Sequence, residues 1–147
     1  LLACLSAAPA VLVYAGEVEQ ENAGQAAQDL LEDMELEEIQ QMMKNFRANP
    51  PRQLAGSDVV MVKDYADLNC TDLRSGKVTK MDFPTTSNVL QFFTADGSKV
   101  SIRPSGTEPK IKFYIEVHDR MASKDDYARC NADAAVKISA VKKDLGI

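Results

Sequence analysis

The stretch that decides the fold is residues 88–117, NVLQFFTADGSKVSIRPSGTEPKIKFYIEV. Its first two strand-like runs, 88–94 and 99–103, flank an Asp-Gly pair, and such a pair between strand-like runs is a strong signal for a β-hairpin. The third run, 111–117, alternates apolar and polar side chains, which predicts a strand with one buried face. Together these runs predict an antiparallel sheet.

The loop between the second and third runs, RPSGTEPK, contains residue types that suit an anion. Arg103 offers a planar fork of donors that matches the oxygens of a phosphate. Ser105 and Thr107 add hydroxyl donors, and Gly106 lets backbone N–H groups approach a ligand. Lys110 adds positive charge. The same residue types form ordinary turns, so the residues alone leave a plain connection open as the alternative.

Further strands and a C-terminal helix are predicted outward from this stretch. The β-branched run at 59–62 predicts a buried strand, and 78–83 predicts a short, weak one. A final helix is indicated by an N-cap at Ser123, a stop at Gly146 and one apolar stripe between them. The stripe consists of Tyr127, Cys130, Ala134, Ile138, Val141 and Leu145.

A second helix is predicted over residues 24–48, because apolar side chains recur there at steps of three and four. Asn49-Pro50-Pro51 ends it, since proline cannot donate a backbone hydrogen bond. The order is therefore helix, strands, helix. This order predicts an α+β fold: a small antiparallel four-stranded sheet covered by two helices, with an N-terminal helical extension.

The N-terminal part differs in character from the rest of the chain. Residues 1–15 are apolar and are interpreted as an interior piece of a longer chain, with a residual signal sequence as the alternative. Nine carboxylates and no lysine or arginine lie between Ala15 and Met43, whereas residues 44–147 carry a net charge of +4. We expect residues 1–38 to form an appended, largely helical extension. Its acidic run is interpreted as a solvated helix face, with a protein-interaction arm as the alternative.

Composition narrows the classes of function. With 147 residues, 45% of them hydrophobic, and a formal net charge of −5, the chain has the make-up of an ordinary globular domain. Mild acidity argues against a general nucleic-acid binder, and no apolar run is long enough to span a bilayer. Neither a nucleic acid nor a membrane is therefore expected as a partner. Cys4, Cys70 and Cys130 are too scattered for a metal site or a disulfide framework. They are interpreted as thiols in a reducing compartment, which favours a cytoplasmic location.

A family resemblance rests on RPSGTEPKIKFY, supported by KNFRANPP and VVMVKDY upstream. These segments resemble the C-terminal domain of the α-D-phosphohexomutases, the phosphoglucomutase and phosphomannomutase superfamily, over residues 39–145. The resemblance implies a TATA-box-binding-protein-like fold for residues 39–147, as the phosphate-binding domain. It also implies which residues grip the non-transferred phosphate of a glucose or mannose 1- or 6-phosphate: Arg103, Ser105, Gly106, Thr107 and Lys110.

The resemblance further implies an enzyme with several domains. In this family a phosphoserine in the first domain transfers its phosphate through a sugar bisphosphate intermediate, and Mg²⁺ is bound by a separate loop. The phosphoserine, magnesium and sugar loops of the family are not found in this sequence. The resemblance therefore implies no catalytic residue and no metal ligand here, and a chain that is inactive alone. Its partners would be hexose phosphate and the other domains. A non-catalytic module that binds sugar phosphate is the alternative.

Overall fold

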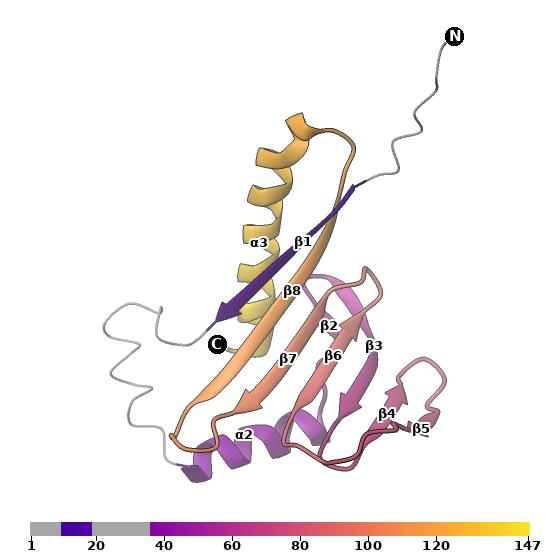
Figure 1. The fold of residues 1–147 in the computed structure, drawn as a ribbon, viewed down its shortest axis with the longest axis vertical. Coiled ribbons are helices and arrows are strands. Elements are labelled where there is room, and N and C mark those ends of the chain that lie inside the picture. The colour runs from indigo at the N-terminus through magenta and orange to yellow at the C-terminus, as the bar shows by residue number, and fades with distance from the viewer. Residues whose placement is uncertain (1–9, 19–35) are drawn as a thin grey trace.

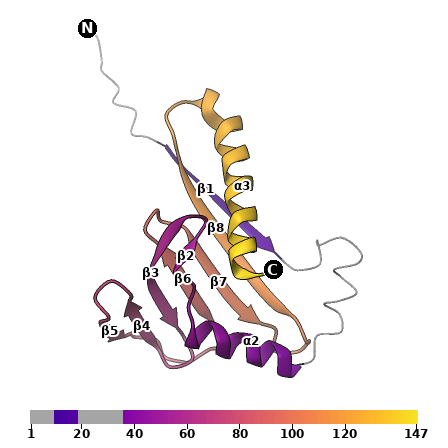
Figure 2. The same cartoon turned by 180° about the vertical axis from the view of Figure 1, so that it is seen from behind.

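The computed structural model describes residues 10–18 and 36–147. Their elements are β1 (Ala10–Val18), α2 (Leu36–Ala48), β2 (Gln53–Leu54), β3 (Ser57–Asp64), β4 (Asn69–Asp72), β5 (Val78–Lys80), β6 (Leu90–Thr94), β7 (Lys99–Pro104), β8 (Ile111–Met121), the 3-10 turn η2 (Lys124–Asp126) and α3 (Tyr127–Leu145). Seven strands form an antiparallel sheet in the order β1-β8-β7-β6-β3-β4-β5, and β2 pairs with the start of β3. Both helices lie on one face of this sheet, behind it in Figure 1 and in front of it in Figure 2.

The core lies between the two helices and that face of the sheet. Strands β6, β7 and β8 pair so that Leu90 faces Ile102 and Ile102 faces Phe113, and these side chains are at most 1% exposed. The predicted alternation of β8 is confirmed, because its buried residues are Ile111, Phe113, Ile115 and Val117. A period of two puts every second side chain on one face of a strand, so these residues share the core.

Helix α2 is fixed to the sheet by its apolar side and by one ion pair. Ile39 and Met43 are buried, and the ring of Phe46 lies 6.1 Å from that of Phe92. Near the end of the helix, the guanidinium of Arg47 donates to both carboxylate oxygens of Asp64, at 2.7 and 3.2 Å. The helix ends at Ala48 before the Asn-Pro-Pro stop, as predicted. Residues 24–35 of the predicted helix lie outside the described residues.

The C-terminal helix confirms most of its predicted stripe. Cys130, Ala134, Val141 and Leu145 are buried. Tyr127 is instead 55% exposed, because it is the first residue of α3 and that end of the helix extends beyond β6 and β7 (Figure 1). The expected N-cap, Ser123, precedes η2 rather than a long helix. Within the described part of the chain, no helix combines the length and apolar character that crossing a bilayer requires.

The β6–β7 hairpin forms where the Asp-Gly pair predicted it. Gly97 has a φ of +89°, a conformation that favours glycine, and it turns the chain between the two strands. The neighbouring carboxylate of Asp96 accepts hydrogen bonds from the hydroxyl of Thr94 and the backbone N–H of Ser98. It also forms an ion pair with Lys137 of α3. The tip of the hairpin is thereby tied to the helix that covers the core.

Two expectations about architecture are wrong. The sheet has seven strands rather than four, because β4 and β5 extend one edge and β1 extends the other. Residues 10–18 form β1 instead of part of a helical extension, and they pair antiparallel along β8 from Ala10 opposite Met121 to Val18 opposite Phe113. A run rich in valine suits a strand, and pairing satisfies the backbone groups that β8 would otherwise present at an edge.

Candidate functional site

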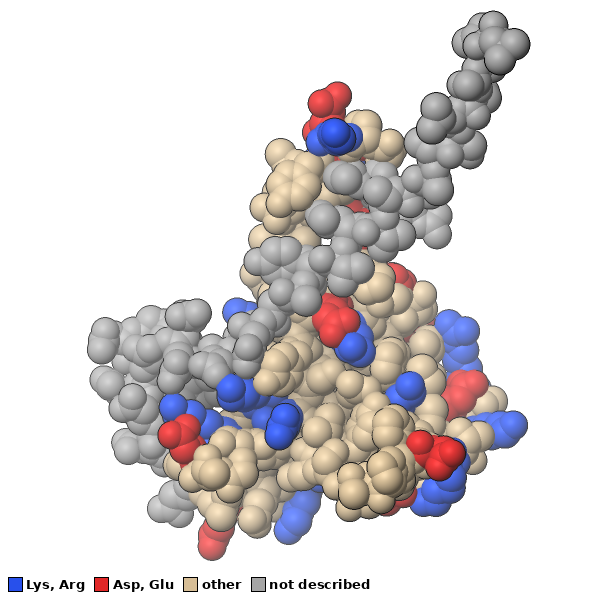
Figure 3. All heavy atoms as spheres, viewed as in Figure 1, with Lys and Arg blue, Asp and Glu red and all other residues tan. Residues whose placement is uncertain are grey.

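The sheet face that carries no helix, called the open face below, bears the polar side chains of the same strands. The register puts on it Lys63, Gln91, Phe93, Lys99, Ser101, Arg103, Lys112, Tyr114 and Glu116. Four of these side chains are cations and one is a carboxylate. Figure 3 views this face, and lysine and arginine side chains gather at its lower left, over the end of β7 and the start of β8. The basic end of the open face therefore adjoins the loop between these strands.

That loop is closed at its base by backbone hydrogen bonds. The N–H of Ser105 donates to the carbonyl of Lys110 at 2.8 Å, and the N–H of Lys110 donates to the carbonyl of Glu108 at 2.8 Å. The hydroxyl oxygen of Ser105 accepts from the N–H groups of Thr107 and Glu108, both at 3.4 Å. Since its oxygen is the acceptor in both contacts, the hydroxyl proton of Ser105 remains able to bind an anion.

Gly106 lies at the tip of this loop with open space in front of it. Its φ is outside the left-handed region, and a Cβ built on it would meet no described atom within 4 Å. The backbone conformation of the loop therefore does not require glycine. A glycine that the fold does not need is consistent with close approach of a ligand to the backbone.

The charges around the loop are incompletely neutralised. Arg103 is exposed and lies directly opposite Lys112 in the β7–β8 ladder. It forms no ion pair with a described residue. Lys110, by contrast, lies 3.5 Å from a carboxylate oxygen of Glu108. The predicted residues thus form one exposed, basic loop end in which the guanidinium of Arg103 is available to an anion.

Sequence reasoning missed a hydrogen-bonded chain of side chains on the open face. The hydroxyl of Tyr65 donates to Gln91 Oε1 at 3.0 Å, and Gln91 Nε2 donates to the hydroxyl oxygen of Ser101 at 3.0 Å. Gln91 and Ser101 are cross-strand neighbours in the β6–β7 ladder. The signal available in the sequence was the polar residue at each of these positions within otherwise apolar strands.

The described residues hold no cluster of three His, Cys, Asp or Glu side chains that could bind a metal ion. The described residues therefore do not fit the Mg²⁺ that the resemblance implies. Cys130 is buried, and this burial, with a hydrogen bond to Asp119, raises the pKa of its thiol. A thiol with a raised pKa is a poor nucleophile near neutral pH.

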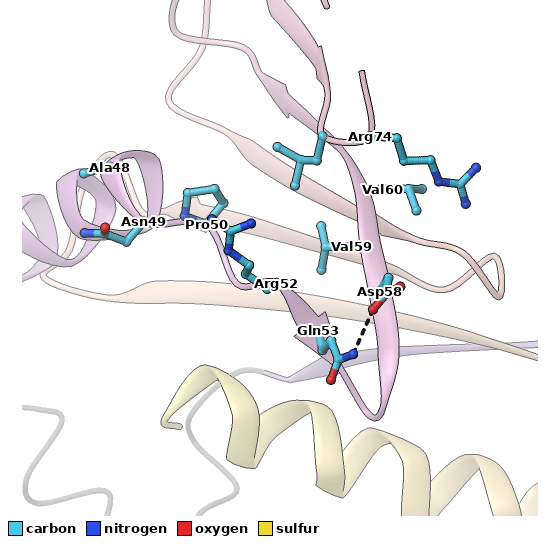
Figure 4. A pocket seen from close by; sticks show the side chains of 10 residues that line it. Ala48, Asn49, Pro50, Arg52, Gln53, Asp58, Val59, Val60 and Arg74 are labelled. Carbon is cyan, nitrogen blue, oxygen red and sulfur yellow. Dashed lines mark hydrogen bonds between the residues drawn. The ribbon is translucent and has the colours of Figure 1, made fainter. Parts of the chain in front are cut away.

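A groove of about 810 Å³ lies elsewhere, between the end of α2, β2, the start of β3 and the turn after β4 (Figure 4). Arg52 and Arg74 lie on opposite sides of it, with Val59 and Val60 between them. None of the predicted site residues lines this groove. The loop between β7 and β8 remains the candidate site.

Comparison with known proteins finds one matching family and a set of bacterial relatives. The family model is that of the phosphoglucomutase/phosphomannomutase C-terminal domain, and it matches residues 17–133. A phosphoglucomutase of Staphylococcus aureus (strain MRSA252) is 37% identical over 79 residues, which cover 54% of this chain and 14% of that protein. A phosphoglucomutase of Staphylococcus epidermidis (strain RP62A) is 29% identical over 129 residues, covering 74% of this chain and 23% of that protein. The chain thus spans less than a quarter of the length of these relatives.

Proposed function

The chain belongs to the phosphoglucomutase/phosphomannomutase family and corresponds to its C-terminal domain, and from this membership we propose that its loop holds a sugar phosphate during isomerisation. Arg103, Ser105, Gly106, Thr107 and Lys110 are the residues proposed to grip the phosphate that is not being transferred. The substrate class is a glucose or mannose 1- or 6-phosphate. The reaction is an intramolecular phosphoryl transfer through a sugar bisphosphate.

The observation that carries this proposal is the state of Arg103. Its guanidinium forms no ion pair with a described residue, lies opposite Lys112, and adjoins a loop whose ends are fixed by β7 and β8. Guanidinium groups bind phosphate through two parallel hydrogen bonds, and loops held by a sheet lose little entropy on binding.

The loop is proposed to orient the substrate rather than to capture it alone. Hydrogen bonds to charged groups contribute roughly 1.5–3 kcal/mol each. Three or four of them, after the cost of association, give an affinity on the order of millimolar. In the bisphosphate mechanism both phosphates must occupy the loop in turn, so a grip that reads phosphate and not the sugar epimer suits the reaction.

The remaining parts of the reaction are assigned to other domains of a longer, cytoplasmic enzyme. The phosphoserine that donates phosphate and the Mg²⁺ that the family implies would lie there, and this chain alone would be inactive. Hexose phosphate and those domains are its proposed partners. The relatives, of which this chain matches less than a quarter, support this division.

Titration by NMR tests the proposal on this chain. Amide signals of residues 103–110 should shift with millimolar glucose 6-phosphate and should not shift with glucose. Arg103→Ala should weaken glucose and mannose phosphates equally, by about tenfold or more, because it removes charge-assisted hydrogen bonds to the shared group.

The matched control is Arg52→Ala. Arg52 is also exposed and also forms no ion pair with a described residue, but it lies in the groove of Figure 4. This variant changes the net charge equally and should leave the titration unchanged. Loss of affinity for only one epimer in Arg103→Ala, or the same loss in both variants, would contradict a phosphate grip at this loop.

A further inference from the structure

The open face carries its side chains in rows that run across the strands from the phosphate loop outward. The row beside the loop is Arg103 on β7 and Lys112 on β8. The next row, two residues further along each strand, contains Gln91, Ser101 and Tyr114, and Lys63 of β3 lies beside Gln91 in the same row. Two residues along a strand correspond to about 7 Å. A ligand phosphate at the first row would therefore bring the group attached to it over the second row.

The second row is polar and held in place. The amide of Gln91 is fixed from both sides, because its oxygen accepts from Tyr65 and its nitrogen donates to Ser101. The ring of Tyr65 is itself supported by Phe83, with ring centroids 5.4 Å apart. These contacts orient the amide before any ligand arrives, which lowers the cost of binding.

Hydrogen-bonding capacity in this row is left unused within the described structure. The hydroxyl of Ser101 accepts from Gln91, so its own proton can still be donated. One N–H of Gln91 also remains. The hydroxyl of Tyr114, directly across the ladder from Ser101, has no hydrogen-bond partner among the described residues. These neutral donors and acceptors are complementary to vicinal hydroxyl groups. At the β3 end of the row, the ammonium of Lys63 lies over the ring of Phe93, 4.9 Å from its centroid.

The side chains of the row differ in length and exposure. Ser101 is 9% exposed, and its short side chain lies between the longer side chains of Gln91 and Tyr114. On the far side of the row, Lys99 and Glu116 form an ion pair at 2.7 Å. The row is thus bounded by Arg103 and Lys112 on the loop side and by an ion pair on the other.

We propose that Gln91, Ser101 and Tyr114 form a binding site for the hydroxylated ring of a sugar phosphate whose phosphate is held at Arg103. The inference rests on the proposed function, because the phosphate fixes the position of the ring. Ser101 donates to a ring hydroxyl, Gln91 holds the oxygen of Ser101, and Tyr114 bonds a neighbouring ring hydroxyl. The phosphate loop gains an adjoining surface that contacts the sugar itself.

Two variants that remove single oxygen atoms test this site. Ser101→Ala and Tyr114→Phe keep the size of the side chains, and Tyr127→Phe on α3 is the control for loss of an exposed tyrosine hydroxyl. Each variant is titrated with glucose 6-phosphate and with inorganic phosphate, and the amide shifts of the chain are followed by NMR. Loss of one neutral hydrogen bond should weaken glucose 6-phosphate about threefold to tenfold. Affinity for inorganic phosphate should be unchanged, and the control should match the unmodified chain with both ligands.

The two ligands separate the possible failures. If inorganic phosphate and glucose 6-phosphate bind the unmodified chain equally well, or if both site variants leave glucose 6-phosphate affinity unchanged, the sugar site is refuted and the phosphate grip stands. If neither ligand shifts residues 103–110, the proposed function fails and this inference fails with it. If only Ser101→Ala unfolds the chain, Tyr114→Phe still decides the outcome.

Discussion

Replacing Gly106 with alanine separates what the fold requires from what the ligand requires. The φ of Gly106 is outside the left-handed region, and a Cβ there would meet no described atom within 4 Å. The folded state should therefore accept the methyl group without strain. Alanine also restricts the unfolded chain, which at compatible positions stabilises proteins by about 0.4–1 kcal/mol.

The effect on binding should have the opposite sign. If a phosphate approaches the backbone N–H groups of the loop, a methyl group at Gly106 occupies part of the space that its oxygens need. Loss of one charge-assisted hydrogen bond, at roughly 1.5–3 kcal/mol, corresponds to a loss of affinity of about tenfold to a hundredfold. Urea denaturation measures the first effect, and NMR titration with inorganic phosphate measures the second.

Gly76→Ala provides the matched control. Gly76 also has no described atom within 4 Å of a built Cβ, but its φ is +72°. Alanine should cost about 1 kcal/mol there and leave phosphate binding unchanged. If Gly106→Ala lowers stability as much as Gly76→Ala, the loop needs glycine for its own conformation. If Gly106→Ala binds phosphate normally, no ligand approaches the backbone at that point, and the reasoning is refuted.

Three further perturbations probe the scaffold. Arg47→Met removes the paired hydrogen bonds to Asp64 and should lower the free energy of unfolding, measured in urea, by about 2 kcal/mol. Phosphate binding should be unaltered. A loss under about 0.5 kcal/mol would mean that the ion pair contributes little to stability. Partial burial raises the pKa of Asp96, but the hydrogen bonds it accepts outweigh this and hold the pKa well below its usual range. The stability that the ionised carboxylate of Asp96 contributes is therefore complete above about pH 5 and lost as pH falls. Asp96→Asn should flatten the decline of melting temperature between about pH 6 and 3, and an unchanged slope would contradict this. Burial raises the pKa of Cys130, so a thiol reagent at about pH 8 should modify Cys70 before Cys130, as mass spectrometry of digests can establish. Faster reaction at Cys130 than at Cys70 would contradict the burial of its thiol.

The parts of the fold that were predicted correctly depend on local pattern. Strand β8 alternates with a period of two from Ile111 to Val117, and the Asp-Gly turn joins β6 to β7. Both features are properties of a short piece of chain, so they can be read without knowing what the chain packs against. The end of α2 before Pro50 is of the same kind.

The misses depend on pairing between distant segments. The sequence predicts a helical extension where β1 lies, since nothing in residues 10–18 alone specifies that their partner is β8, about a hundred residues later. The chain of hydrogen bonds through Gln91 likewise needs the register of β3, β6 and β7 together. Residues 103–110 could be proposed as a phosphate site from sequence for the opposite reason, because they are consecutive. The finer details of their role remain predictions.

The two faces of the sheet have a consequence for evolution. Core residues under the helices alternate along the same strands with residues of the open face. The two sets therefore share a backbone but few neighbours. Substitution at Gln91, Ser101 or Tyr114 can therefore be sampled while the packing of Phe92, Ile102 and Phe113 is conserved. A randomised library confined to the open face should retain a high fraction of folded members. In such a domain, new ligand preferences can arise by drift on one side of the sheet while selection for folding acts on the other.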